Sequence, residues 1–312
     1  MLRSLYSGVS GMKGFQTKLD TIGNNIANVN TYGFKKGRVT FQDTMSQTIS
    51  SAQGPVTNGN DDARGGLNPS QVGLGSQIGS IDTIHTQGNR QTTNRPLDLA
   101  LEGDGMFVLA ESGTAGVNVG GNIADLEKVQ LSFSRAGNFY LDNEGAIVNN
   151  NGKYVVGEPY TEVADGDNTA SGSAGAITIP EDAQSFSIQT DGTINYINAN
   201  NEVKVAGKLK LANFSNPGGL EKIGGNEFRA TQNSGFISAN GEAQDELNTF
   251  NDLSNAGENG TGQMVSGALE MSNVDLADSF TEMITSQRGF QANTKIITTS
   301  DEILQELVNL KR

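Results

Sequence analysis

The segment GNNIANVNTYGFKK, residues 23–36, ends an apolar pattern with a run of asparagines followed by Tyr-Gly-Phe. Upstream of this segment, apolar residues recur every seven positions, and a second apolar row follows three positions behind the first. This spacing predicts an amphipathic helix over residues 4–31 with Ser4 as its N-cap. The stripe residues that we expect to face a partner are Leu5, Val9, Met12, Leu19, Ile22 and Ile26.

The end of this predicted helix carries more amides than a helix cap requires. Gly33 fits the left-handed position that follows a helix, and Phe34 would then pack back against Val29. Lys35 and Lys36 would lie where the helix dipole favours cations. Asparagine is a poor helix former, so hydrogen bonds to a partner or to the following chain are expected to offset its cost, unless the amides form a simple solvated cap. The motif residues are Asn24, Asn25, Asn28, Asn30, Gly33 and Phe34.

The C-terminus repeats the design of the N-terminus. Ser272 or Asn273, followed by Asp275 and Asp278, indicates the start of a second long helix. Its expected core residues are Phe280, Met283, Phe290, Ile297 and Leu304. Polar or small residues interrupt the stripes of the two helices at Gln16, Gly23, Gln287, Thr294 and Asp301. We therefore expect the terminal helices to be poorly ordered in the free monomer and to fold on assembly.

Between the two ends, the pattern changes to short alternating runs bounded by Gly, Asn and Asp. Runs such as GMFVLA (105–110), SFSIQTDGTINYI (185–197) and KLKLANF (208–214) predict strands and hairpins. Segments 50–75 and 251–263 are rich in Gly, Asn and Ser, and are expected to be irregular, flexible connectors. The predicted fold class is α+β, with the two terminal helices paired in a coiled-coil-like layer and a mainly-β body inserted between them.

Composition excludes several classes of function. The chain has 312 residues and a net charge of −14, which argues against nucleic acid or an anionic membrane as its main partner. It has no cysteine, and its single histidine, His85, is interpreted as a surface or edge residue. No catalytic site, metal site, cofactor or small-molecule substrate is therefore expected. The N-terminus has no continuous apolar core, so we also expect no cleaved signal peptide.

The two terminal helices are expected to pair with each other and then with further copies of the chain. Both keep a seven-residue interval over several repeats, which is typical of coiled-coil pairing, although each helix could instead pack on the β body. A single pair would leave part of these wide apolar stripes in water, and exposed apolar surface of that size usually marks an interface. Head-to-tail contacts between copies would build a ring or an open helical assembly.

Several motifs resemble those of the bacterial flagellar rod and hook protein family. They are NNIANVNTYGFKKGRVTFQD (24–43), LDLALEGDGMFVL (97–109), LANFSNPGGLEKIGGNEFRATQNSG (211–235) and the segment from 266 to 312. These motifs follow the family order over nearly the whole chain. Among the members, the chain most resembles the hook protein of Gram-positive bacilli, with the distal rod protein next.

The resemblance implies a structural subunit that polymerises into a curved tube and transmits torque from rod to filament. It implies self-association, contacts with the distal rod protein, the hook cap and the hook–filament junction proteins, and export by the flagellar type III apparatus. The expected location is the extracellular flagellar hook. The expected division is 1–34 with 272–312 as the helical polymerisation domain, 35–75 with 251–271 as a connector layer, 76–157 with 206–250 as the β domain, and 158–205 as a small insertion that could belong to the β domain.

Two other classes were weighed against this interpretation. A carbohydrate-active enzyme needs paired carboxylates in one cleft, and the acidic residues here lie beside predicted turns, as solvated carboxylates commonly do. An extracellular binding or adhesion module is the other alternative. Its support is weak, because GLGSQIG (73–79) lacks the spacing of a dinucleotide loop and DNEG (142–145) lacks the alternating ligands of a calcium loop.

Overall fold

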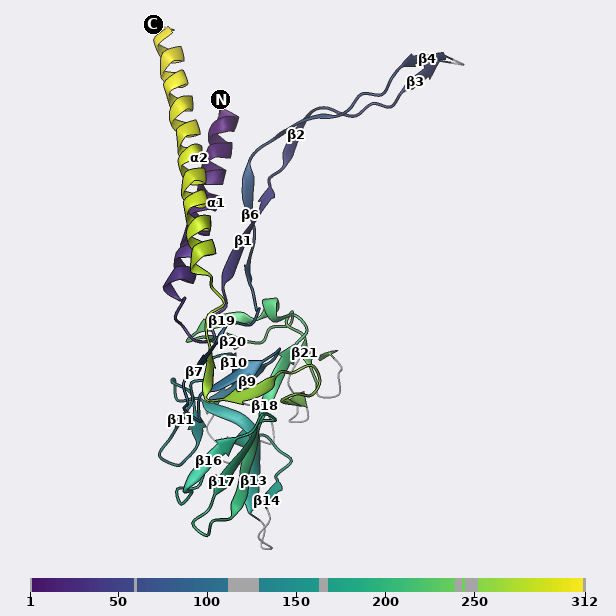
Figure 1. Ribbon diagram of the computed structural model, residues 1–312. Coiled ribbons are helices and arrows are strands. Elements are labelled where there is room, and N and C mark those ends of the chain that lie inside the picture. Colours follow the sequence, from purple (N-terminus) through teal and green to yellow (C-terminus); the bar gives the residue numbers. More distant parts are fainter. Residues whose placement is uncertain are drawn as a thin grey trace. The chain divides into compact units, whose positions relative to one another are not determined.

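The computed structural model describes residues 2–58, 61–111, 129–162, 168–238, 243–244 and 252–310. The chain divides into two compact units, which are considered separately (Figure 1). Unit 1 contains residues 1–27, 37–83 and 275–312, and unit 2 contains residues 28–36 and 84–274. In the part of the chain that is described, no helix has the length and apolar character needed to cross a membrane.

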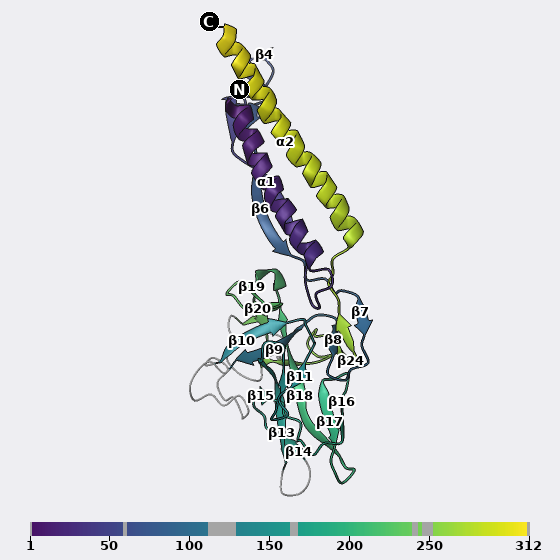
Figure 2. The ribbon, with the colours of Figure 1, turned by 90° about the vertical axis from the view of Figure 1, so that its left-hand side faces the viewer.

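Unit 1 is built around two long helices, α1 (Leu2–Ala27) and α2 (Leu276–Leu310), which lie side by side (Figure 2). They are antiparallel, because Gly8 of α1 lies against Ile297 while Phe15 lies against Gly289. Helix α2 begins where the Asp275 carboxylate accepts hydrogen bonds from the backbone N–H groups of residues 277 and 278, at 2.7 and 3.3 Å. The pairing of the terminal helices is therefore confirmed, whereas both helices start at residues other than the predicted caps.

The rest of unit 1 is a two-stranded antiparallel ribbon. It is formed by three successive pairs: β1 (Gly37–Asp43) with β6 (Ser76–Thr83), β2 (Ser46–Ser50) with β5 (Ser70–Gly73), and β3 (Val56–Asn58) with β4 (Asp61–Arg64). The sequence interpretation expected an irregular segment at 50–75, and the structure differs because backbone hydrogen bonds pair the strands without needing apolar side chains. Helix α1 packs against β1 and β6, so it contacts both α2 and the ribbon.

Unit 2 is the inserted β body, as predicted. Its main sheet has the order β11-β12-β13-β18-β9-β10-β20-β19, and β16 and β17 join it through β18. Its elements are β7 (Arg90–Thr92), β8 (Leu99–Glu102), β9 (Met106–Glu111), β10 (Gln130–Ser134), β11 (Tyr140–Leu141), β12 (Ile147–Val148), β13 (Tyr154–Glu162), β14 (Asn168–Ala170), β15 (Gly175–Ala176), β16 (Ser185–Ile188), β17 (Thr193–Ile197), β18 (Val203–Phe214), the 3₁₀ helix η2 (Pro217–Gly219), β19 (Glu221–Gly224), β20 (Glu227–Arg229), β21 (Phe236–Ile237), β22 (Ala243–Gln244), β23 (Ser254–Asn255), β24 (Gln263–Ser266) and β25 (Ala268–Glu270).

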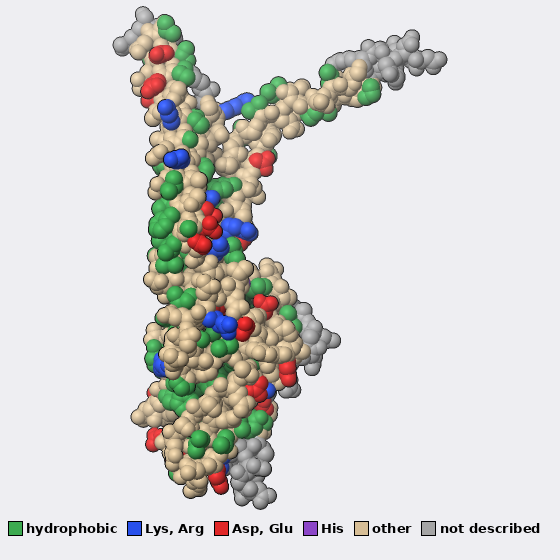
Figure 3. All heavy atoms as spheres, viewed as in Figure 1, with side chains coloured by type: hydrophobic (Ala, Val, Ile, Leu, Met, Phe, Trp, Pro, Cys, Tyr) green, Lys and Arg blue, Asp and Glu red, His purple; other side chains and the backbone are tan. Residues whose placement is uncertain are grey.

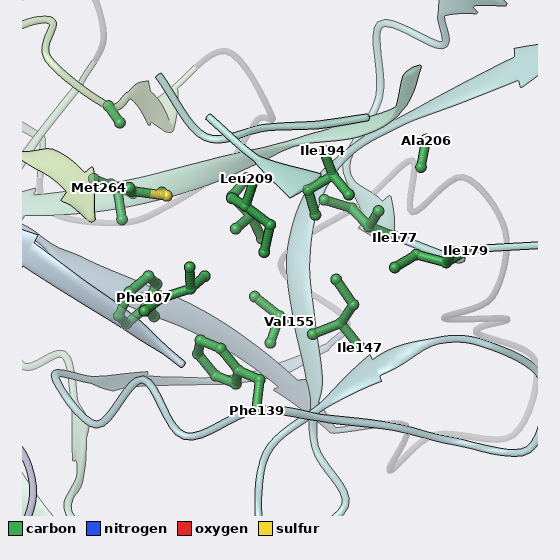
Figure 4. Packing of buried hydrophobic residues seen from close by; sticks show 14 of the residues in the cluster. Phe107, Phe139, Ile147, Val155, Ile177, Ile179, Ile194, Ala206, Leu209 and Met264 are labelled. Atoms are coloured by element: carbon green, nitrogen blue, oxygen red, sulfur yellow. The ribbon is translucent and has the colours of Figure 1, made fainter. Parts of the chain in front are cut away.

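Strand β9 is buried on both faces and separates two hydrophobic clusters. Phe107 and Leu109 point into one cluster, and Val108 points into the other, because successive side chains of a strand alternate between faces. Figure 4 shows the first cluster, in which Phe107 meets the ring of Phe139 edge-on with centroids 5.1 Å apart. Such two-sided burial gives unit 2 a core of its own.

Candidate self-assembly surface

The row of α2 that faces α1 alternates large apolar residues with small polar ones. Met283, Phe290, Ile297 and Leu304 are half-buried along this row, as the heptad predicts. Between them lie Ser286, Asn293 and Ser300, which the sequence interpretation did not place in the interface. Phe280 was also expected in the core, but it belongs to an adjoining row that is exposed, and its side chain is 49% exposed.

Helix α1 has its predicted stripe at the interface, but glycines set how closely its neighbours approach. Ile22 is buried, and Leu5, Val9, Met12, Leu19 and Ile26 are half-buried. A Cβ on Gly11 would lie 2.9 Å from the Asn293 amide, and one on Gly289 of α2 would lie 2.7 Å from the Phe15 ring. The spaced glycines in SGVSGMKGF (7–15) were the available signal for this close packing.

The opposite face of α1 packs on the ribbon through small residues. A Cβ on Gly14 would lie 2.7 Å from the ring of Phe41 in β1, and that ring also lies 5.6 Å from the Phe15 ring between centroids. Gly75, next to β6, approaches Ser10 so closely that a side chain there would displace the serine hydroxyl. Because α1 is covered from two sides, most of the exposed hydrophobic residues of unit 1 lie on α2 and the ribbon, with Tyr6 of α1 as the exception.

Unit 1 exposes most of the large hydrophobic side chains found on the surface. Sixteen of the twenty such exposed residues within the described ranges lie in unit 1, although it is the smaller unit. Figure 3 shows hydrophobic side chains spaced along the visible face of the helices and of the ribbon. The most exposed of those in unit 1 are Tyr6, Met45, Ile49, Ile81, Ile284, Val308 and Leu310. Surface of this kind marks an interaction site rather than a solvated face.

The asparagine motif is divided between the two units. In unit 1, the Asn25 side chain holds Gly37 on both sides: its amide donates to the Gly37 carbonyl at 2.8 Å, and its oxygen accepts from the Gly37 N–H at 2.9 Å. In unit 2, Asn28 accepts a hydrogen bond from the Thr31 hydroxyl at 3.1 Å. Asn24 and Asn30 lie at exposed positions. The buried amide thus fixes the turn from α1 into β1, as expected for hydrogen bonds to the following chain.

Gly33 has the predicted left-handed backbone (φ 68°), but it does not cap the helix. Helix α1 already ends at Ala27, and the Gly33 N–H donates to the Glu270 carbonyl at 2.8 Å. A Cβ at Gly33 would lie 2.6 Å from the backbone nitrogen of Ala136. The prediction that Gly33 ends the helix was therefore wrong. Its left-handed backbone instead allows the chain to approach another backbone within unit 2.

Lys35 was predicted to lie at the helix end, where the helix dipole favours cations, and it is instead fully buried. Its Nζ donates to the Glu270 carboxylate at 2.6 Å and to the Thr86 carbonyl at 2.8 Å. The Arg135 guanidinium reaches the second carboxylate oxygen at 3.3 Å, and the Gly88 N–H donates to the first at 2.9 Å. Burial lowers the pKa of the Lys35 ammonium, and the Glu270 carboxylate opposes this shift. One carboxylate thus pairs with two buried cations, and the Asp104 carboxylate also favours their charged forms.

Asn273 ties together three chain segments of unit 2 and does not start a helix. Its side-chain oxygen accepts from the Lys36 N–H at 2.8 Å, and its amide donates to the Ile84 carbonyl at 2.8 Å. Residues 36, 84 and 273 all lie close in sequence to the points at which the chain passes from one unit to the other. No local pattern in the sequence indicates these hydrogen bonds, because their partners are distant along the chain.

His85 was predicted to be a surface or edge residue, and it is half-buried against Phe228, with ring centroids 5.4 Å apart. Among the described residues, neither of its ring nitrogens has a hydrogen-bond partner. Burial, together with the cationic Lys35 and Lys222, lowers the pKa of His85 to about 4. The imidazole is therefore neutral at physiological pH. No cluster of three or more His, Asp or Glu side chains suited to a metal ion occurs in the described ranges.

Comparison with known proteins gives matches over the whole chain. Family models match at residues 5–35 (flagella basal body rod protein), 123–196 (flagellar hook protein FlgE/F/G D1 domain) and 265–310 (flagellar basal body rod FlgEFG protein, C-terminal). The chain is 50% identical to the flagellar basal-body rod protein FlgG of Bacillus subtilis over 315 positions, with both chains covered completely. It is 34% identical to FlgG of Caulobacter vibrioides, and 34% identical to the flagellar hook protein FlgE of Borreliella burgdorferi over 460 positions.

Proposed function

Because the chain belongs to the flagellar hook and rod protein family, we propose that it is a structural subunit of the distal rod of the flagellar basal body. The family consists of structural proteins of the flagellum, so the chain is not an enzyme. Family membership also implies assembly with copies of itself and with other axial proteins of the flagellum. The observation that carries the proposal is the 50% identity to a rod protein over the full length of both chains.

The expectation of a hook subunit was wrong. The hook relative is less similar, and its alignment needs 460 positions for the 312 residues of this chain, whereas the rod relative needs only 315. The signal was present in the sequence, because the segment 158–205 is too short to hold a large additional domain. Three further expectations depended on the hook interpretation and are withdrawn with it. They are the curved tube, the extracellular hook location, and contacts with the hook cap and the hook–filament junction proteins.

Unit 1 supplies the surface that we assign to self-assembly. The side chains described for β2 and β5 are exposed on both faces, and an isolated two-stranded ribbon is at best marginally stable in water. Met45 and Ile49 are 83% and 67% exposed on this ribbon, and Leu310 is 83% exposed on α2. Copies of the chain that cover these residues would remove apolar area from water at about 25 cal/mol per Å². Unit 1 then provides the contacts that drive polymerisation, and unit 2 joins the assembly through its covalent connection to unit 1.

The proposal is tested by assembly of the purified full chain. Negative-stain images are expected to show straight rods, and Ile49→Ser is expected to raise the concentration needed for assembly by about tenfold, since burial of one isoleucine contributes about 1.5–3 kcal/mol. Ile223→Ser is the matched control, because Ile223 is also exposed (42%) but lies in unit 2. A chain that stays monomeric at high concentration, or equal effects of the two substitutions, would contradict the assignment.

A further inference from the structure

We propose that two reciprocal contacts, Phe15 on Gly289 and Asn293 on Gly11, fix the α1–α2 pair in a single register. Each contact places a large side chain of one helix on a glycine of the other. The first has its large residue on α1, and the second has it on α2. The proposal concerns the interior of unit 1, and it does not depend on which flagellar part the subunit builds.

The apolar rows by themselves do not determine the register. On α2, Met283, Phe290, Ile297 and Leu304 repeat every seven residues, and on α1 the residues Leu5, Met12, Leu19 and Ile26 repeat at the same interval. If α1 slid along α2 by seven residues, large apolar side chains would again face large apolar side chains. Such a slip would move the helices by about 10 Å along their axes, at about 1.5 Å per residue. Another feature must therefore select the register that is observed.

The contact between Phe15 and Gly289 cannot be repeated in a slipped pair. A Cβ on Gly289 would already lie 2.7 to 3.0 Å from three atoms of the Phe15 ring, so this ring occupies the space of the missing side chain. After a slip of seven residues, Phe15 would face Ile296 or Glu282 instead of the glycine. Neither residue leaves room for the ring at this distance between the helices.

Asn293 opposes the same slips, because its amide fills the space left by Gly11. Its amide lies 2.9 Å from the position of a Cβ on Gly11, and its backbone carbonyl lies 3.5 Å from that of Gly8. After a slip of seven residues the amide would face Ser4 or Lys18 in place of Gly11, and either side chain would occupy the space that the amide fills. A polar residue at one core position is a known way to specify register in paired helices.

The chain contains no cysteine, so introduced cysteine pairs can report the register directly. Met12→Cys with Thr294→Cys reports the observed register, because the Thr294 hydroxyl lies 3.8 Å from the Met12 sulfur. Leu19→Cys or Leu5→Cys, each combined with Thr294→Cys, reports a slip of seven residues in either direction. Oxidation of the assembled full chain, followed by non-reducing electrophoresis, separates the disulfide formed within one chain from those between chains.

We expect only the 12–294 disulfide in the parent chain. Gly289→Leu is expected to lower its yield by about fivefold or more, which corresponds to about 1 kcal/mol, and to produce one of the slipped disulfides. Gly23→Leu is the matched control, because a Cβ on Gly23 of α1 has no atom within 4 Å. An unchanged 12–294 yield in Gly289→Leu, or loss of all three disulfides, would overturn the proposal.

Asn293→Leu provides a second test. This substitution favours helix formation, since leucine is a better helix former than asparagine. It is expected to keep the 12–294 disulfide and to add slipped disulfides that the parent lacks. Slipped disulfides that remain at the parent level would show that the asparagine does not select the register. Sedimentation of the same samples measures assembly separately, so a failure of polymerisation is distinguished from a change of register.

Discussion

Replacing Glu270 with glutamine tests how much of the stability of unit 2 depends on its buried charge cluster. The carboxylate accepts from the Lys35 ammonium, the Arg135 guanidinium and the Gly88 N–H at 2.6, 3.3 and 2.9 Å. The Lys35 and Glu270 side chains are fully buried, and the Arg135 side chain is 4% exposed. Glutamine has the same shape but no charge, so the two cations would lose their paired carboxylate and keep only the electrostatic interaction with Asp104. Breaking a buried ion pair in this way costs about 3–5 kcal/mol.

The assay is urea unfolding of the dilute full chain, followed by the near-ultraviolet circular dichroism of tyrosine. Five of the six tyrosines lie in unit 2, so this signal reports mainly the unit that contains the cluster. Glu221→Gln is the matched control, because Glu221 pairs with Arg229 at 2.7 Å on the surface, where both side chains are about half exposed. An exposed pair of this kind contributes about 1 kcal/mol or less.

The reasoning would be refuted if Glu270→Gln lowered the free energy of unfolding by no more than the control does. A double substitution gives a further check, because replacing both charges of a buried pair by apolar residues is often neutral. Lys35→Met with Glu270→Leu is expected to recover part of the loss caused by Glu270→Gln. The recovery is expected to be incomplete, since Arg135 would keep only its hydrogen bond to the Gly103 carbonyl, at 2.7 Å.

Three further predictions concern single residues. The pKa of His85 is lowered to about 4, so the unfolded chain binds the proton more readily; stability is then full above pH 6.5 and falls by about 2 kcal/mol as pH drops toward 4. His85→Phe should flatten this dependence in urea titrations, and an unchanged slope would contradict it. Gly33→Ala should cost about 1–3 kcal/mol more than Gly152→Ala, because both glycines are left-handed but only Gly33 touches another backbone; equal losses would show that strain alone matters. Asn25→Ala should speed hydrogen exchange of the Gly37 N–H by about tenfold, measured by NMR or mass spectrometry, and unchanged exchange would mean that the amide does not hold the turn.

The sequence predicts those parts of the fold that depend on local periodicity. The seven-residue interval located both helices, and the alternating runs located β9 within one residue and the second half of β18. The run QIGSIDTIHTQG (77–88) predicted β6, but the part of the ribbon within 50–75 was missed because its strands are rich in small polar residues. Composition indicates flexibility for such segments, whereas their backbone hydrogen bonds produce regular strands.

The sequence predicts the candidate site only where the position of a residue follows from the periodicity of its own helix. The apolar stripes of α1 and α2 follow from spacing, whereas the burial of Lys35 depends on Glu270, which no local pattern connects to it. Gly11 and Gly289 fall between these cases, because their small size is visible in the sequence but the side chains that fill the space are not. The distinction between rod and hook depended on chain length, since both types share the motifs that carried the resemblance.

The 235 positions that separate Lys35 from Glu270 have a consequence for the order in which the subunit matures. A ribosome releases the lysine long before it adds the glutamate, and it adds the residues of α2 later still. Until then the Lys35 ammonium of the nascent chain lacks the Glu270 carboxylate, and α1 lacks its partner helix α2. The charge cluster of unit 2 and the helix pair of unit 1 can therefore form only after segments far apart along the chain have both been made.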